Sequence, residues 1–375
     1  MDFVAFMLVL ALAYANGTND VSKAIATLVG SGVTQYHTAI LWGTCWTIAG
    51  AGASAFLASA MVKTFSQGLV QPGTAIEPPV SSAVLTGAMT WVIIASRTGL
   101  PVSTTHALTG AIIGTGLAAF TGDSLLWAAI AKKIALPLLV SPILALVVSL
   151  LFHPLMRVLA AKWKGACVCV LPASRALVTI DASGKTRTLF QTTSLGQPIM
   201  AIPSQCDRMG LRGLVFGLDT IHWISSGLAS FARGTNDAPK IVAMLLLSST
   251  TATWPNSSSQ LAAFGGVALA MGLGSYFGGL RVTTVLAEKV TKMNHAEGLS
   301  ANLTTSSLVL AAGTLGLPVS TTHLSSSAII GIGLANGLRA VRWHTVRDML
   351  LAWIITIPAT ALFAWIAYIS LSGFP

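Results

Sequence analysis

Two polar motifs occur twice in this chain, and their residue types suit the binding of small ions. Residues 99–106 are Gly-Leu-Pro-Val-Ser-Thr-Thr-His, and the same eight letters return at 316–323. A proline fits the start of a helix, and Ser or Thr at the following positions can cap it. Free first-turn N–H groups, the helix dipole and three hydroxyls then favour an anion. Two ordinary N-caps are the alternative. The six hydroxyl residues are Ser103, Thr104, Thr105, Ser320, Thr321 and Thr322.

The second motif, Gly-Thr-Asn-Asp, interrupts an apolar stretch at residues 17–20 and again at 234–237. An ionisable side chain inside a membrane helix is costly and marks a functional site. A carboxylate beside an Asn amide and unwound carbonyls could hold a small cation or accept a proton. An Asp that caps the following half-helix is the alternative. The candidate coupling residues are Asn19, Asp20, Asn236 and Asp237.

Further ionisable residues accompany both motifs. Lys23 and Lys240 follow the aspartates by three residues, which places each pair on one helix face. Each lysine is either a structural ion-pair partner or a tethered cation that replaces a bound ion or touches the anion. Arg233 is expected to add attraction at one mouth of the site. His106 and His323 are expected to donate supporting hydrogen bonds, with a proton-coupling role as the alternative.

These motifs belong to an internal duplication. Asp20 and Asp237, His106 and His323, and the two lysines are all separated by 217 residues. A constant offset of polar, specific letters indicates two homologous halves. We assign residues 1–152 to a first repeat, 153–212 to a basic connecting segment and 213–375 to a second repeat.

The composition predicts what surrounds the motifs. Only 9% of the 375 residues are charged and 54% are hydrophobic, against about 25% charged residues in an ordinary soluble domain. This excludes a soluble enzyme, a disordered protein and a cytosolic binding module, and favours a polytopic membrane protein in a lipid bilayer. The net charge of +10 is concentrated in connecting segments, so we expect no nucleic-acid partner. The four cysteines lack zinc spacing, so neither a structural metal nor a cofactor is expected.

The pattern of apolar segments predicts an all-α fold. In the first half, residues 2–15 and 21–31 are expected to form one discontinuous helix, and 37–62 and 134–152 to cross the membrane. Residues 81–96 and 104–120 flank a polar linker and are expected to form a re-entrant hairpin. Each half is expected to cross the membrane three times. Because three is odd, the second half begins on the opposite side of the membrane and has the inverted orientation relative to the first. The expected architecture is therefore an inverted-topology repeat with two discontinuous helices and two re-entrant helical hairpins.

Charge predicts the orientation. Fourteen Lys or Arg residues fall in 153–212, 281–297 and 338–347, against three in the loops of the other side. This bias places 153–212 in the cytoplasm and both termini outside the cell membrane. Within the segment 153–212 we expect a small β-rich insert, with strands near 176–181 and 185–190 and a turn at 182–184. A regulatory docking site and a linker are its two alternative roles.

The motif pair resembles the inorganic phosphate transporter family of ion-coupled phosphate permeases, over both halves but not over 160–208. The resemblance implies phosphate held by the Ser-Thr-Thr tips and coupling cations near the Asn-Asp pairs. The family signature usually has Gly-Ala-Asn-Asp-Val-Ala-Asn, whereas this chain has lysine at the last position in both copies, Lys23 and Lys240. Our hypothesis is therefore proton coupling, or fewer sodium ions per cycle.

The sequence therefore predicts a cation-coupled symporter that moves inorganic phosphate by alternating access, with a proton or sodium as the coupling ion. A permease for sulfate or another tetrahedral oxyanion is the first alternative. A membrane-embedded hydrolase is less favoured, because the candidate residues form two equal sets whereas a catalytic centre usually needs one asymmetric set. A channel is less favoured because Asp and Lys at helix breaks favour alternating access. No enzymatic activity is expected, and a homodimer is left open.

Overall fold

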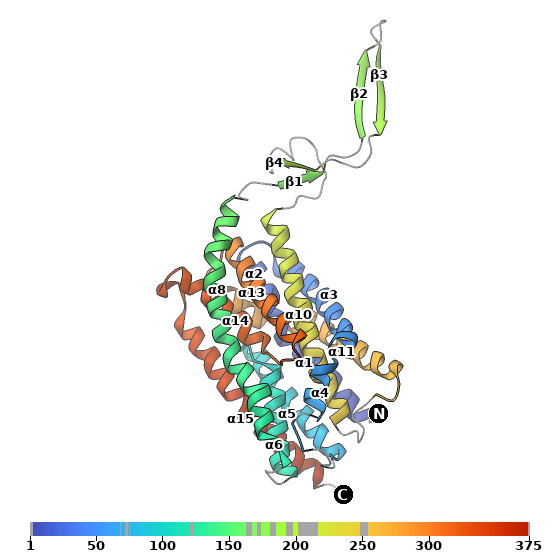
Figure 1. The fold of residues 1–375 in the computed structure, drawn as a ribbon, viewed down its shortest axis with the longest axis vertical. Coiled ribbons are helices and arrows are strands. Elements are labelled where there is room, and N and C mark those ends of the chain that lie inside the picture. The colour runs from blue at the N-terminus through green and yellow to red at the C-terminus, as the bar shows by residue number, and fades with distance from the viewer. Residues whose placement is uncertain are drawn as a thin grey trace.

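The protein is a bundle of long helices in the computed structural model (Figure 1). The first half contains α1 to α8, joined by short connections. Their bounds are α1 Phe3–Asp20, α2 Ser22–Gly30, α3 Tyr36–Leu57, α4 Ser59–Gln67, α5 Pro78–Thr98, α6 Thr104–Ala119, α7 Trp127–Ala129, a π-helical stretch Ile130–Ala135, and α8 Leu136–Lys162. The residues that the structure describes are 3–67, 69–71, 74, 76–120, 124–162, 167–170, 174–180, 185–192, 198–201, 217–247 and 254–373.

The second half has the same order of helices. They are α10 Leu218–Leu247, α11 Ser257–Gly278, α12 Leu280–Glu288, α13 His295–Thr314, α14 Thr321–Ala335, a 3-10 turn Leu338–Ala340, and α15 Trp343–Ser372. Adding 217 to the bounds of α6 gives residues 321–336, against Thr321–Ala335 for α14. The helices therefore follow the offset of the sequence repeat.

Short strands lie between the halves. β1 (Cys167–Val170) pairs antiparallel with β4 (Pro198–Ala201), and β2 (Ser174–Ile180) with β3 (Thr186–Thr192). Ile180 faces Thr186 across the second ladder. The expected turn at 182–184 and the boundary at 212–213 lie outside the described residues.

In the described part of the chain six helical segments are long and apolar enough to cross a bilayer, so the prediction of an all-α polytopic membrane protein is confirmed. Those segments are Phe3–Gly30, Tyr36–Leu57, Pro78–Thr98, Trp127–Lys162, Ser257–Gly278 and Trp343–Ser372. α6 and α14 have 16 and 15 residues, or about 24 Å of helix, which is short of a ~30 Å hydrocarbon core. Both termini lie at the end of the bundle opposite the strands (Figure 1).

The two halves interleave instead of forming separate bodies. α1 packs against α11, and its repeat counterpart α10 packs against α3. In the same way α15 packs on α5 and α6, whereas α8 packs on α13 and α14. Each hairpin is therefore held by a long helix from the other half.

Glycines of the Gly-Thr-Asn-Asp motif allow two of these close approaches. A Cβ on Gly17 would lie 2.1 Å from the Met271 carbonyl oxygen in α11, and a Cβ on Gly234 would lie 2.6 Å from the Thr47 oxygen in α3. Small residues at such crossings let helix backbones meet in lipid. The first letter of the motif thus serves packing between the halves.

The prediction of two discontinuous helices is wrong in its details. α10 runs without interruption through Gly234 to Asp237, and the first copy is broken only at Val21. Val21 itself keeps helical dihedrals, φ −58° and ψ −35°. The motif can stay helical because its polar side chains find their partners on the hairpin tips, so no unwound carbonyls are needed beside the aspartates.

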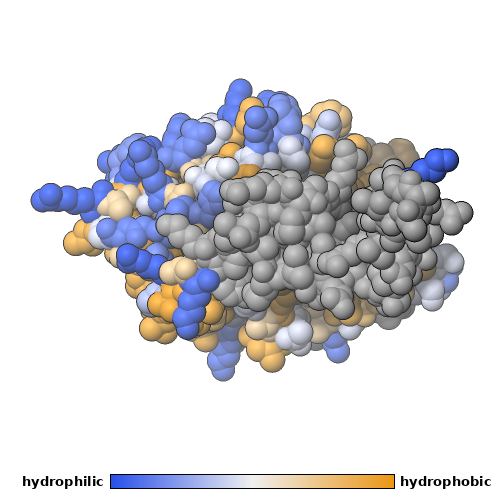
Figure 2. Space-filling model, turned by 90° about the horizontal axis from the view of Figure 1, so that it is seen from above, coloured by the Kyte–Doolittle hydropathy of each residue, from blue (hydrophilic) through white to orange (hydrophobic). Residues whose placement is uncertain are grey.

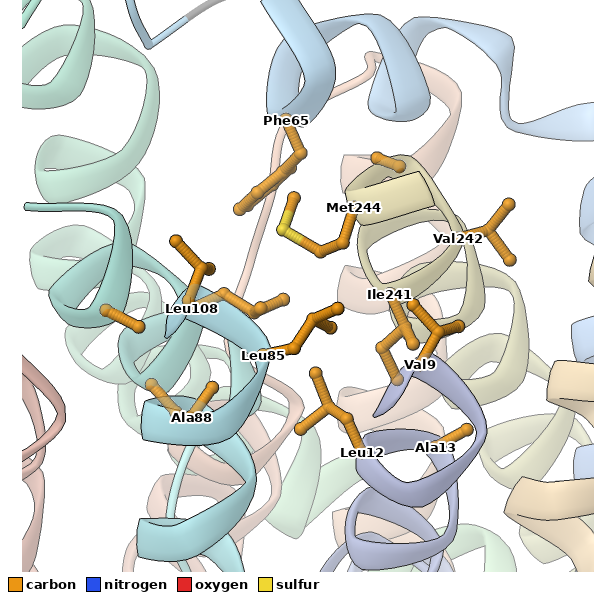
Figure 3. Close-up of a cluster of buried hydrophobic side chains, with 14 of the residues drawn as sticks. Val9, Leu12, Ala13, Phe65, Leu85, Ala88, Leu108, Ile241, Val242 and Met244 are labelled. Atoms are coloured by element: carbon orange, nitrogen blue, oxygen red, sulfur yellow. The ribbon is translucent and has the colours of Figure 1, made fainter. Parts of the chain in front are cut away.

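The largest hydrophobic cluster packs beside these motifs, between α1, α4, α5, α6 and α10 (Figure 3). Leu12 from α1, Leu85 from α5, Leu108 from α6, and Ile241 and Met244 from α10 point into it. The surface at the end of the bundle that carries the strands is shown in Figure 2. Hydrophilic side chains gather on part of this surface, and hydrophobic side chains lie at its margin. The cluster thus fixes the motif helices and the hairpins against each other.

Candidate functional site

The tips of the two hairpins meet inside the bundle. The Thr105 hydroxyl donates to the Val319 carbonyl across 3.3 Å, and the Thr322 hydroxyl donates to the Val102 carbonyl across 2.6 Å. Each tip therefore touches the start of the opposite helix, α14 or α6. This is the close approach that two facing anion sockets require.

Both helix starts are capped by serine, as predicted. The Ser103 side chain accepts a hydrogen bond from the His106 N–H, and Ser320 accepts one from the His323 N–H. Pro101, by contrast, lies two residues before the cap, outside the helix. The expectation that proline opens the helix is wrong, because the serine side chain takes the capping position.

All six predicted hydroxyl residues are buried, between 0% and 4% exposed. Buried hydroxyls at the starts of two facing helices, with the positive ends of both helix dipoles behind them, are suited to an anion. In the present arrangement several of these groups are paired within the protein. The six are Ser103, Thr104, Thr105, Ser320, Thr321 and Thr322.

The two aspartates converge on one amide group. Asn16 Nδ2 lies 3.1 Å from Asp20 Oδ2 and 3.5 Å from Asp237 Oδ2. The same nitrogen lies 2.7 Å from the Thr104 hydroxyl at the start of α6. The carboxylates of the two halves thus share one donor that also contacts a predicted anion-binding residue.

Lys23 connects the first aspartate to the first tip. Its Nζ forms an ion pair with Asp20 and donates to the Val102 carbonyl across 3.0 Å. The side chain is only 2% exposed. A buried charge of this kind needs a partner, and Asp20 supplies it.

Lys240 makes the corresponding contacts in the second half and one more. Its Nζ lies 3.2 Å from Asp237 Oδ1 and donates to the Val319 carbonyl across 3.1 Å. It also donates to the Thr105 hydroxyl across 2.7 Å. This lysine therefore contacts both hairpins at once.

The two asparagines of the motif differ. Asn19 uses both ends of its amide on the first tip, since Nδ2 donates to the Leu100 carbonyl across 2.9 Å and Oδ1 accepts from the Val102 N–H across 3.1 Å. Asn236 donates to the Val319 carbonyl across 3.2 Å, but its Oδ1 is buried and has no hydrogen-bond partner among the described residues. Asn19 therefore holds the tip, and Asn236 keeps an oxygen available.

Arg233 does not lie at a mouth of the site, which corrects the prediction. It is 2% exposed and donates to the Thr47 hydroxyl, with Ser275 3.5 Å away. Its Nε and Nη1 have no hydrogen-bond partner, and among the described residues no carboxylate forms an ion pair with it. The crossing of α10 with α3 and α11 buries it.

The histidines lie together behind the tips. The rings of His106 and His323 are 4.6 Å apart between centroids, and His323 Nδ1 lies 3.3 Å from the Leu138 carbonyl. The His323 ring also packs on Trp353, whose indole N–H donates to the Pro101 carbonyl across 3.2 Å. These side chains of α6, α14 and α15 therefore contact each other and the first tip.

The formal charges of this cluster add to +1, from two carboxylates, two ammonium groups and one guanidinium. A net positive, hydroxyl-rich and buried centre suits an anion. Asn16 Oδ1 and Asn236 Oδ1 have no hydrogen-bond partner in the part of the chain that the structure describes. These oxygens and the carboxylates suit a cation or a proton.

Sequence reasoning missed Asn16 and Ser96. Ser96 near the end of α5 accepts from Thr18 across 2.9 Å and from Asn19 across 3.3 Å. A signal for Asn16 existed, because the residue 217 positions later is Arg233, so the repeat carries a polar residue at that position in both halves.

Comparison with known sequences gives consistent matches. The sequence model of the Phosphate transporter family matches residues 16–364. The "Probable low-affinity inorganic phosphate transporter" of Rhizobium meliloti is 30% identical over 369 residues, covering 95% of this chain and 92% of the relative. The "Inorganic phosphate transporter 2-1, chloroplastic" of Arabidopsis thaliana is 28% identical, covering 95% of this chain and 70% of the relative.

Among solved structures, one titled "The sodium-dependent phosphate transporter" superposes with a TM-score of 0.74 at 23% identity, and the match covers 99% of both chains. At this identity the likeness concerns the fold. The arrangement of helices described above therefore has a counterpart in a solved protein.

Proposed function

The chain belongs to the phosphate transporter family, and from this membership we propose that it is a secondary active transporter that moves inorganic phosphate across the cell membrane. The family and the relatives are transporters and permeases, so the chain is not assigned an enzymatic activity. The observation that carries the proposal is the meeting of two buried Ser-Thr-Thr helix starts next to two aspartates.

Phosphate would bind between the two tips. Its oxygens would take over hydroxyl donors that now serve the protein's own carbonyls, above all Thr105 on Val319 and Thr322 on Val102. First-turn N–H groups of α6 and α14 add donors, and they have no partners inside their helices. Ser103 and Ser320 position these starts by capping them.

Sulfate remains the second candidate, because a tetrahedral oxyanion of either kind fits a ring of donors. Phosphate differs in that it can donate a proton to a carboxylate. Thr104 is joined to Asp20 and Asp237 through Asn16, which places acceptors beside the cradle. This favours phosphate, and competition by sulfate for labelled phosphate uptake tests it.

For coupling we propose a proton held by Asp20 and Asp237. Each carboxylate already has its own ammonium, Lys23 or Lys240, where the family signature has a neutral asparagine. A fixed ammonium supplies the compensation that a bound sodium ion would otherwise give. The Oδ2 atoms of both aspartates face Asn16, so one proton can neutralise charge at this shared point.

Alternating access follows from the proposed inverted relation of the halves. Each re-entrant hairpin is held by a long helix of the other half, so movement of one half against the other would expose the cradle to one side at a time. The basic segment 153–212 lies on the cytoplasmic side and both termini outside, in the orientation that the charge bias favours.

Uptake of labelled phosphate into proteoliposomes tests the proposal. A pH gradient, acidic outside, is expected to drive accumulation above the equilibrium level in the absence of sodium. Accumulation against a gradient also excludes a channel and a hydrolase. If only a sodium gradient drives accumulation, proton coupling and the tethered-cation role of the lysines are wrong.

A further inference from the structure

A polar cavity of about 220 Å³ lies away from the hairpin tips. It opens where the last turns of α8, the start of α13 and the end of α14 come together. All three segments lie next to loops that the charge bias places in the cytoplasm. Its lining residues are His153, Arg157, Asn294, Ala296, Glu297 and Asn336.

Two basic side chains of α8 line one wall. His153 is 8% exposed, yet no hydrogen bond joins its ring to another described residue. Arg157 follows four residues later on the same helix face and forms no ion pair within the described part of the chain. A buried imidazole and a free guanidinium aimed at one cavity are unused donors for a ligand.

The opposite wall is the start of α13. Asn294 caps this 20-residue helix, and Ala296 lies in its first turn, where N–H groups have no partner inside the helix. The one acidic residue in the lining, Glu297, is already engaged: Oε2 accepts from the Asn294 N–H across 2.7 Å and Oε1 from the Asn336 amide across 2.9 Å. The free groups of this wall are therefore donors.

The polar pair Glu297 and Asn336 of this cavity is not repeated in the first half. The positions 217 residues before Asn294, Glu297 and Asn336 hold Glu77, Val80 and Ala119, so the cap position is polar in both halves but the partners of the Glu297–Asn336 contact are apolar in the first half. The transport scaffold that the two halves share therefore does not require this set of residues. A feature present in one half only indicates a role outside the shared mechanism.

We propose that this cavity is a second anion site, which binds a phosphoryl group at the cytoplasmic face. His153 and Arg157 supply charge-assisted donors, and the start of α13 supplies N–H groups and its dipole. The cavity has room for several waters, since one water occupies about 30 Å³ in the liquid, and hence for a tetrahedral oxyanion. A bound group would tie α8 to both helices of the second hairpin.

The phosphoryl group can come from free inorganic phosphate or from an anionic lipid headgroup, and two experiments on the full chain distinguish them. The first is equilibrium dialysis of labelled phosphate with purified protein in detergent. The second is thermal unfolding in nanodiscs of phosphatidylcholine with and without phosphatidylglycerol. Both compare wild type with R157Q, and K162Q removes a charge from the same helix outside the cavity as a control.

In the phosphate arm, R157Q is expected to bind one phosphate per chain fewer than wild type and K162Q, or to bind it at least about tenfold more weakly. In the lipid arm, phosphatidylglycerol is expected to raise the unfolding midpoint of wild type and K162Q but not of R157Q. The experiment in which R157Q differs from wild type and K162Q shows whether the phosphoryl group comes from inorganic phosphate or from the lipid headgroup. R157K, which keeps the charge, is expected to retain most of the effect.

The proposal is overturned if R157Q and K162Q bind the same amount of phosphate and show the same shift of the unfolding midpoint with phosphatidylglycerol. It is also overturned if the cavity binds a divalent cation and E297Q loses that binding. Phosphate uptake by R157Q shows that this variant is folded. The difference between R157Q and K162Q does not depend on whether the hairpin tips bind phosphate, so failure here is distinguishable from failure of the transport proposal.

Discussion

Lys240 donates a hydrogen bond to the hydroxyl of Thr105, 2.7 Å away, although the two residues belong to different halves of the duplication. The same ammonium pairs with Asp237 and holds the Val319 carbonyl. In the first half the equivalent lysine, Lys23, contacts only Asp20 and its own tip in the described part of the structure. The two copies of the motif are thus inequivalent in their contacts, which is compatible with the proposed alternating access.

The hydroxyls that now hold the opposite tips provide the first prediction. Thr105→Val and Thr322→Val each remove a donor and keep the side-chain shape, so KM for phosphate is expected to rise about 10- to 100-fold, the range for hydrogen bonds to charged groups. Concentration-dependent uptake into proteoliposomes measures it. Thr314→Val, at an exposed hydroxyl of α13, is the control. Unchanged KM in both variants contradicts the cradle.

The shared position of the two aspartates predicts a separation of exchange from accumulation. Asp20→Asn and Asp237→Asn keep the amide contacts near Asn16 but remove a proton acceptor. Phosphate counterflow is expected to survive, whereas net uptake driven by a pH gradient is expected to fall at least about tenfold. Asp348→Asn, at an exposed position of α15, is expected to change neither. Loss of accumulation without loss of exchange assigns the carboxylates to coupling.

The hairpin tips could be predicted from the sequence, because polar residues that recur in an otherwise apolar chain are most simply explained as residues of a binding site. The serine caps followed from local chemistry that the helix start alone determines. The continuous backbone through Asp237 could not be predicted, because it depends on carbonyls such as that of Val319, which arrive from a distant hairpin. Asn16 was missed because its repeat counterpart, Arg233, has a different chemistry and different partners.

The close helix crossings predict a stability effect. Gly17→Ala and Gly234→Ala would press a methyl group onto backbone of the other half and are expected to lower stability by about 1–3 kcal/mol. Gly52→Ala, with no atom within 4 Å of the new methyl, is expected to be neutral or to stabilise α3 by up to about 1 kcal/mol. Thermal unfolding in detergent compares them. Equal midpoints for all three variants would contradict the crossings.

The orientation is tested by single cysteines in a background without the native four. A membrane-impermeant thiol reagent applied to intact cells is expected to label Lys63→Cys and not Arg347→Cys, because the charge bias places α4, which holds Lys63, outside and the start of α15 inside. Permeabilised cells are expected to label both, which controls for accessibility. The opposite pattern would invert the topology and also move the α8–α13 cavity to the outer face.

The lysines that replace asparagine predict a change of coupling ion. In Lys23→Asn and Lys240→Asn the ammonium that now pairs with each aspartate is lost, so its carboxylate needs another cation. Under the proposed proton coupling, sodium is expected to stimulate phosphate uptake by these variants but not by the wild type, and most strongly in the double variant. Lys292→Asn, in a loop, controls for loss of positive charge. The measurement is uptake with a sodium gradient at equal pH on both sides. Stimulation of the wild type to the same extent would mean that the ammonium groups do not substitute for sodium, and that their function is to hold the Val102 and Val319 carbonyls of the tips.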